Sequence, residues 1–137
     1  RFFAAQGQGA NLRHIETQSA ISARLCATLD TAVLATTSPD LFANTPGEAA
    51  WTRVSRQAKL TRYGGDCYNY ALLALGQVDI VMEQGLKDVD IQPLIKIIEE
   101  AGGIVTNWQG GSAQEGGTAM ACGDKALHAK MLDVLAQ

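Results

Sequence analysis

Two carboxylates near the middle of the chain have the type and spacing needed to bind a cation or a polar substrate group. Glu83 ends an alternating, β-branched run that predicts a strand over 78–83, and Asp90 opens a helix after a turn at Gly85. Both side chains can then face one crevice at the carboxyl end of a strand, where α/β proteins place ligands. From residue type alone, Glu83 is either a ligand-binding carboxylate or a solvated strand end.

The helix that begins at Asp90 has one apolar face. Its aliphatic residues recur at helical spacing and are Ile91, Leu94, Ile95 and Ile98. Asp90 suits an N-cap, Pro93 is tolerated in the first turn, and Gly102 ends the helix. A carboxylate at a helix start is rigidly held, so Asp90 is either a Mg²⁺ ligand or a plain helix cap.

A second candidate site precedes the central strand. A glycine pair ending at Gly65 lets the backbone approach a ligand, and Asp66 is predicted to cap a helix that runs to Leu75. Backbone N–H groups at such a position can hold a polar group, while the Asp66 carboxylate would repel a phosphate and attract an ammonium. Arg62 either pairs with Asp66 or reaches a substrate. A capped helix after a glycine turn remains the alternative interpretation.

The composition is that of a globular domain. The 137 residues can bury a real core, and the proportions of 47% hydrophobic and 18% charged residues are ordinary for a globular protein. A net charge of −3 without a basic cluster argues against a nucleic-acid partner, and no apolar run approaches the roughly 18 residues of a membrane span. Cys26, Cys67 and Cys122 show no paired spacing, so we expect reduced thiols in a cytoplasmic protein.

Strands and helices alternate along the chain. The first residues predict a hairpin over 2–5 and 8–12, followed over 15–23 by a loop that leads into a short strand or helical turn. Further strands are predicted at 31–36, 60–63, 104–108 and 118–122, with helices at 48–58 and from Asp124 onward. This alternation predicts one α/β domain with a mixed β-sheet flanked by helices.

These motifs together resemble the inositol monophosphatase-like family of magnesium-dependent phosphatases. The C-terminal signature of that family is an acidic residue, a short loop, Trp-Asp, an apolar helix and Ala-Gly-Gly. The chain has Glu83, Val89-Asp90 and Ala101-Gly102-Gly103 at these places, so Val89 replaces the tryptophan, where a valine can still pack but the packing of the loop is left open. Segments 62–76, 35–42 and 3–10 extend the resemblance, the first two toward the histidinol-phosphatase branch.

The resemblance implies which half of the enzyme is present. Residues 1–137 resemble the C-terminal half of the layered family fold, and the Gly-Glu helix and Asp-Pro-x-Asp-Gly-Thr loop of the N-terminal metal-binding half do not occur. Asp90 would then bind Mg²⁺, while Glu83, Asp66, Gly65 and Arg62 would bind substrate. No catalytic base is identified in this chain, and the isolated chain is expected to be inactive because a two-metal phosphatase needs several ligands.

The resemblance also implies the reaction and its partners. The expected activity is Mg²⁺-dependent hydrolysis of a small phosphate monoester, first of all histidinol phosphate in histidine biosynthesis. Inositol phosphate and other sugar or nucleotide-linked phosphates remain alternatives, as does a non-catalytic α/β interaction module. The expected protein partners are the N-terminal half of the enzyme and a second copy in a homodimer.

Overall fold

The strands form two separate sheets in a computed structural model that describes all residues from 1 to 137. The main sheet has the order β5-β4-β6-β8-β7. Its members are β4 (Val33–Thr36), β5 (Leu60–Tyr63), β6 (Ile80–Leu86), β7 (Ile104–Thr106) and β8 (Gly117–Cys122). β4 runs parallel to β5 and β6, whereas β8 runs antiparallel to β6 and β7. The prediction of a mixed sheet is therefore confirmed.

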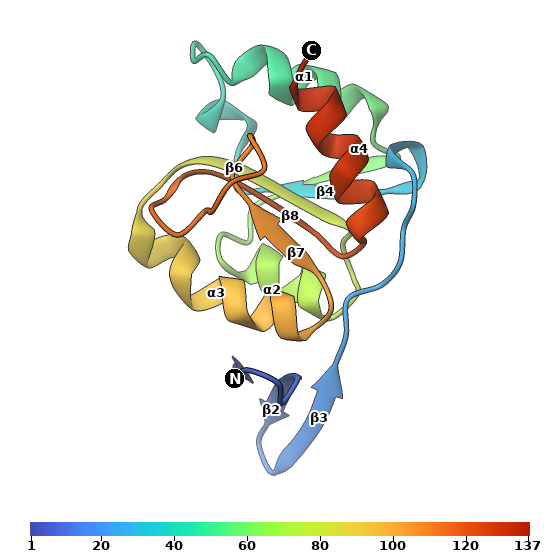
Figure 1. Ribbon diagram of the computed structural model, residues 1–137, viewed down its shortest axis with the longest axis vertical. Coiled ribbons are helices and arrows are strands. Elements are labelled where there is room, and N and C mark those ends of the chain that lie inside the picture. Colours follow the sequence, from blue (N-terminus) through green and yellow to red (C-terminus); the bar gives the residue numbers. More distant parts are fainter.

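Helices cover both faces of this sheet (Figure 1). The helices are α1 (Glu48–Gln57), α2 (Tyr68–Ala74), α3 (Asp88–Glu100) and α4 (Lys125–Leu135), with short 3₁₀ turns at Leu29–Thr31 and Pro39–Leu41. Because successive strand residues point to opposite faces, Leu34 packs toward α1 and α4 while Ala35 packs toward α2 and α3. None of these helices combines the length and the apolar run that crossing a bilayer requires.

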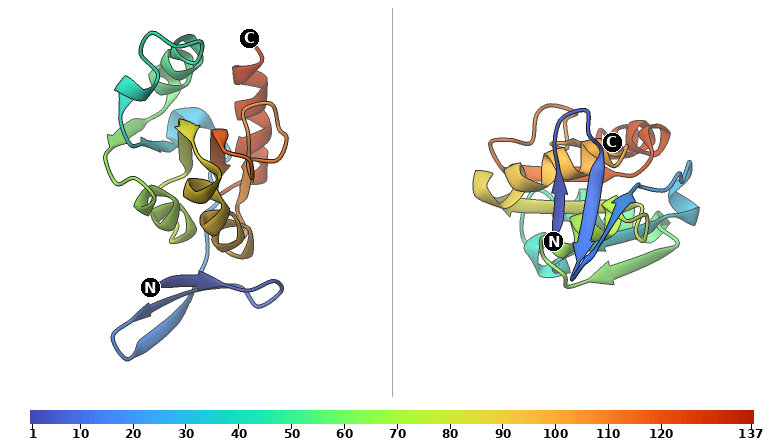
Figure 2. Two further views of the ribbon diagram at one scale, coloured as in Figure 1. Left: turned by 90° about the vertical axis from the view of Figure 1, so that its left-hand side faces the viewer. Right: turned by 90° about the horizontal axis from the view of Figure 1, so that it is seen from below.

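The first residues form a small second sheet beyond α2 and α3 (Figure 2). It contains the antiparallel strands β1 (Phe2–Ala4), β2 (Ala10–His14) and β3 (Thr17–Ile21). The carboxylate of Glu100 ties it to α3, because its two oxygens accept from the backbone N–H groups of Gly7 at 2.8 Å and Gly9 at 2.9 Å. The predicted hairpin is confirmed. Of the loop and short strand or helical turn predicted over 15–23, the structure has a short, mostly polar strand, because β3 pairs with β2 over its whole length.

Two helix starts differ from the predictions. α3 begins at Asp88, so Asp90 is its third residue and not its N-cap; Oδ2 of Asp90 accepts from the backbone N–H of Lys87 at 2.8 Å. An acidic residue can close a helix start from this position as well. Asp66 does not cap α2 either. It has a left-handed φ of 47° and precedes Cys67, and α2 begins only at Tyr68.

The turn predicted at Gly85 is wrong as well. Strand β6 continues to Leu86, and the register against β8 shifts between Gln84 and Leu86. Gly85 has a φ of 76°, which only glycine adopts at little cost, so it forms a bulge inside the strand. A glycine near the end of a strand pattern is compatible with either a bulge or a turn. The pairing of β6 with β8 on both sides of Gly85 shows that it is a bulge.

An ion pair between the half-exposed side chain of Arg24 and a buried carboxylate fastens the segment between the two sheets. Asp79, which lies just before β6 and is 1% exposed, accepts from Nε and Nη2 of Arg24, both at 2.6 Å, and from the backbone N–H of Val33 at 2.7 Å. Burial alone would raise the pKa of Asp79, but the hydrogen bonds from Arg24 and Val33 and the charge of Arg24 hold that pKa below its ordinary value. The pair joins the segment after β3 to the start of β4 and β6.

Replacing Arg24 should therefore destabilise the protein. We expect Arg24→Ala to lower the free energy of unfolding by about 1–3 kcal/mol, because Asp79 would stay buried with a single donor. The loss should narrow as the pH falls below about 4, where the Asp79 carboxyl takes up a proton in the variant. Urea unfolding at several pH values measures both effects. Arg56→Ala, which removes an exposed arginine from α1, is the control.

Candidate substrate and metal site

A buried carboxylate lies in the middle of β6. Glu83 is only 3% exposed, and its Oε1 accepts from the backbone N–H of Thr37 at 2.9 Å and from the Thr37 hydroxyl at 2.6 Å. The parallel pairing of Ala35 with Val81 brings Thr37, which directly follows β4, beside Glu83. Oε2 of Glu83 accepts no hydrogen bond from the protein. Glu83 is therefore not a solvated strand end. It is a buried residue with one carboxylate oxygen that accepts two hydrogen bonds and another that accepts none from the protein.

Two further carboxylates act on Glu83. Burial raises the pKa of Glu83, the hydrogen bonds from Thr37 oppose that rise, and the negative charges of Asp66 and Asp90 add to it. Asp66 precedes α2 and Asp90 lies in the first turn of α3, and both are exposed. The structure thus brings together three of the side chains singled out in the sequence, at one edge of the sheet.

The loop before α2 is shaped by its glycines. Gly65 has a φ of 92°, and a Cβ there would lie 2.5 Å from Oδ1 of Asn69, so a larger residue would strain the turn. Asn69 is buried and donates to the carbonyl oxygen of Gly64 at 2.7 Å. The backbone N–H groups of Gly65, Asp66 and Cys67 donate to no atom of the chain. They remain available to a ligand.

Arg62 lies apart from the three carboxylates. It is exposed on β5, it forms no ion pair with Asp66, and it lines a groove of ≈ 410 Å³ with Gly65 and Asn69. The pairing of Arg62 with Asp66 that the sequence left open is absent. Val89 does not pack into the core, because its side chain is 66% exposed beside Asp90.

Sequence reasoning missed two residues of this region. Thr37, which directly follows the strand predicted at 31–36, was not among the candidate site residues, although it supplies both donors to Glu83. Tyr70 on α2 is 2% exposed and its hydroxyl has no hydrogen-bond partner. Burial raises its pKa well above the ordinary value, and the charges of Glu83 and Asp66 raise it further. The sequence signal for Thr37 is its position directly after β4, a strand that pairs with the central strand β6.

Of the candidate site residues, Asp90 is the one whose carboxylate suits a metal ligand. One oxygen of Asp90 accepts from Lys87, and its other oxygen accepts no hydrogen bond and is exposed to solvent. No group of three or more carboxylate, histidine or cysteine side chains is arranged to hold a metal ion. Mg²⁺ is commonly bound by one or two carboxylates with water and substrate oxygens. Asp90 therefore suits a contribution to a Mg²⁺ site that needs further ligands.

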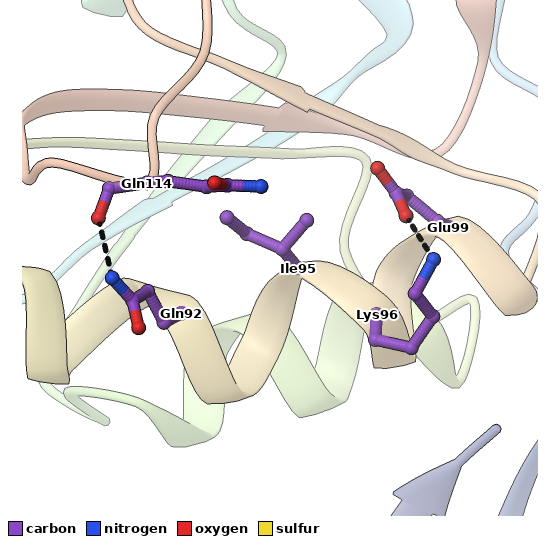
Figure 3. A pocket seen from close by; sticks show the side chains of 5 residues that line it. All are labelled: Gln92, Ile95, Lys96, Glu99 and Gln114. Carbon is purple, nitrogen blue, oxygen red and sulfur yellow. Dashed lines mark hydrogen bonds and ion pairs between the residues drawn. The ribbon is translucent and has the colours of Figure 1, made fainter. Parts of the chain in front are cut away.

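Another depression, of ≈ 330 Å³, lies between α3 and the loop before β8 (Figure 3). Two of its polar side chains, those of Gln92 and Lys96, already donate hydrogen bonds within the protein. Nε2 of Gln92 donates to the carbonyl oxygen of Gln114 at 3.1 Å, and Nζ of Lys96 donates to Glu99 at 2.8 Å. It contains none of the candidate site residues, so we assign no chemistry to it.

Comparison with known proteins agrees with this fold. Over 96% of the chain, the structure resembles an inositol monophosphatase from Zymomonas mobilis with a TM-score of 0.82 and 38% identity, covering 55% of that chain. An inositol monophosphatase from Anabaena has a TM-score of 0.82 at 25% identity over 99% of this chain and 55% of its own. These similarities define an α/β fold of layered sheets and helices.

Sequence relatives are consistent with the structural neighbours. A protein of Arabidopsis thaliana named bifunctional phosphatase IMPL2, chloroplastic, is 44% identical over 124 residues, or 84% of this chain and 36% of the relative. A histidinol-phosphatase of Chlorobaculum parvum is 36% identical over 53 residues, or 39% of this chain and 20% of the relative. The inositol monophosphatase family model matches residues 1–137. The chain belongs to the inositol monophosphatase family.

The raised pKa of Glu83 has a consequence for stability. The folded state holds the Glu83 proton more tightly than the unfolded state does, so the charged form costs stability at neutral pH. We expect Glu83→Gln to raise the free energy of unfolding at pH 7 by about 0.5–2 kcal/mol, since its oxygen can still accept from Thr37. The gain should disappear below about pH 4, where Glu83 itself is protonated.

Chemical unfolding of the 137-residue chain at pH 7 and below pH 4 measures this gain. Glu115→Gln removes an exposed carboxylate and is the control. A Glu83→Gln variant that is less stable than the parent at pH 7 would mean that the charged form supports the fold.

Proposed function

We propose that this chain is the substrate-binding part of a Mg²⁺-dependent phosphate monoesterase, and that its substrate is histidinol phosphate. The observation that carries the proposal is the buried carboxylate of Glu83, with one free oxygen, beside Asp66 and Asp90. Such a cluster of negative charge favours a substrate that carries a positive amine. The phosphatase and histidinol-phosphatase names of two sequence relatives support the same class.

Different residues of this chain would bind the amino-alcohol end and the phosphate end of the substrate. Glu83 binds the ammonium of the amino alcohol, and Asp66 adds to the attraction from the loop before α2. The free N–H groups around Gly65 donate to a polar group of the substrate, and Arg62 lines the same groove as Gly65. Asp90 would hold Mg²⁺, which when bound stabilises charge on the phosphate and lowers the pKa of the attacking water.

The remaining ligands would come from an N-terminal half. The chain spans only 36% of its Arabidopsis relative and 55% of its Zymomonas structural neighbour. Both outer edges of the small sheet, β1 and β3, are unpaired, and four of the five β3 residues are exposed. We propose that this half docks here, that the isolated chain is inactive without it, and that the complete enzyme forms a homodimer.

A second candidate is an inositol phosphatase. The observation that favours it is the 38% identity with an inositol monophosphatase over nearly the whole chain. A neutral polyol would also donate hydrogen bonds to Glu83, but it would lose less than a cation when that charge is removed. Relative turnover of the two substrates therefore separates the candidates, and a protein without turnover of either would be an interaction module.

Substrate choice can be tested through Glu83. We expect Glu83→Gln in the complete enzyme to raise KM for histidinol phosphate about tenfold or more, equivalent to ~1.4 kcal/mol of lost binding. Inositol phosphate and a simple aryl phosphate should change much less, because neither carries a cation. The measurement is kcat/KM for all three substrates in both proteins. A parallel loss across the three would assign Glu83 to the fold or the metal site and remove the main support for histidinol phosphate.

The metal role can be tested through Asp90. Asp90→Asn in the complete enzyme should raise the Mg²⁺ concentration for half-maximal activity about tenfold or more, or ~1.4 kcal/mol. The melting temperature should hardly move, because the amide oxygen can still accept from Lys87. Asp88→Asn changes an exposed carboxylate in the same helical turn and is the control. If Asp90→Asn leaves the Mg²⁺ dependence unchanged, Asp90 is not a metal ligand and serves only to accept the Lys87 N–H at the start of α3.

A further inference from the structure

The hydroxyl of Tyr70 is a buried polar group without a partner. Tyr70 is 2% exposed in the middle of α2, and its oxygen forms no hydrogen bond with the protein. Buried hydroxyls are nearly always hydrogen-bonded, so each exception calls for a physical reason. The hydroxyl of Thr36 is the other such atom, but Thr36 alternates with Ala35 on β4 and faces α1 and α4.

Tyr70 shares a face of the sheet with Glu83. Its ring packs in one cluster with Ala35, Val81 and Ile91. Glu83 follows Val81 by two positions on β6 and therefore points to the same side, and Ile91 directly follows Asp90. The charges of Glu83 and Asp66 both act on the phenol and help to raise its pKa, which keeps the hydroxyl protonated and neutral.

An unused acceptor lies on the same side. Oε1 of Glu83 is occupied by Thr37, while Oε2 accepts nothing, and the Tyr70 hydroxyl does not donate to it. The Tyr70 hydroxyl is enclosed, whereas Oε2 of Glu83 is not among the fully buried atoms that lack a partner and keeps some contact with solvent. A third group that bonds to Oε2 and to the hydroxyl would give the hydroxyl its missing partner. Because the surrounding charges are negative, a cation that donates several hydrogen bonds fits best.

We propose that Tyr70 is a specificity-determining residue: its hydroxyl oxygen and Oε2 of Glu83 together accept hydrogen bonds from the ammonium group of an amino-alcohol phosphate. The inference rests on the proposed function, and it adds a residue and a two-point contact to it. The phenol contributes no charge of its own, so it selects by hydrogen-bond geometry, whereas Glu83 attracts by charge. A phosphate group is repelled from this position by Glu83 and Asp66.

The test is Tyr70→Phe in the complete enzyme, with histidinol as the probe. Isothermal titration should give a histidinol Kd about tenfold higher than in the parent, equivalent to ~1.4 kcal/mol. The value of kcat/KM for histidinol phosphate should fall by a similar factor, while that for an aryl phosphate should stay within about twofold. The melting temperature should not fall, because the hydroxyl makes no hydrogen bond within the protein.

Tyr68→Phe is the matched control. It removes a hydroxyl from the same helix at a residue that is 51% exposed, and it keeps the edge-to-face ring contact with Phe2. Its histidinol affinity and both kinetic constants should equal those of the parent. Any loss as large as that in Tyr70→Phe would show that the effect is not specific to Tyr70.

The outcomes separate this inference from the proposed function. An enzyme that hydrolyses histidinol phosphate but binds histidinol equally well in parent and Tyr70→Phe overturns the inference alone. Parallel loss of turnover for both phosphates does the same, because it assigns Tyr70 to the fold. Selective weakening of histidinol binding in an enzyme that does not hydrolyse histidinol phosphate supports the two-point contact and overturns the proposed function. A parent that does not bind histidinol overturns both.

Discussion

The burial of the Glu83 carboxylate beside two like charges is the constraint on which the site depends. Its position is set by the parallel pairing of β4 with β6, which brings both donors of Thr37 to one oxygen and leaves the other free. Asp66 and Asp90 approach from the starts of α2 and α3. Such an arrangement costs stability in the folded protein, which is the usual signature of a site built to bind an oppositely charged group.

The two buried carboxylates of this strand region, Asp79 and Glu83, differ in how their oxygens are hydrogen-bonded. Asp79, just before the strand, is matched by a guanidinium and a backbone N–H, and its pKa is lowered. Glu83, in the middle of the strand, is matched on one oxygen only, and its pKa is raised. Both are almost completely buried. The ion pair of Arg24 with Asp79 fastens the segment between the sheets. Oε2 of Glu83 accepts no hydrogen bond from the protein and remains available to a ligand.

The layers explain why the site residues come from loops and helix starts. α2 and α3 lie between the main sheet and the small sheet, and their packed faces leave only their first turns near the carboxyl end of β6 (Figures 1 and 2). The core holds these turns in place: Ile91 is fully buried next to Asp90, and Asn69 braces the loop before α2. Rigid packing beside each polar group is what gives such a site its geometry.

The sequence by itself determined the alternation of strands and helices, the mixed sheet and the two carboxylates around the β6–α3 turn, because these follow from local hydrophobic periodicity. It misplaced the helix starts at Asp66 and Asp90, since an acidic residue stabilises a helix start from more than one position. It left β3 undecided between a short strand and a helical turn, because the polar residues of β3 carry no apolar alternation and are ordered by pairing with β2. The contact of Thr37 with Glu83, the isolation of Arg62 and the unpartnered hydroxyl of Tyr70 were decided only by the tertiary structure. Each of these features depends on strands and helices far apart in the chain, and local sequence patterns hold no information about which of them become neighbours.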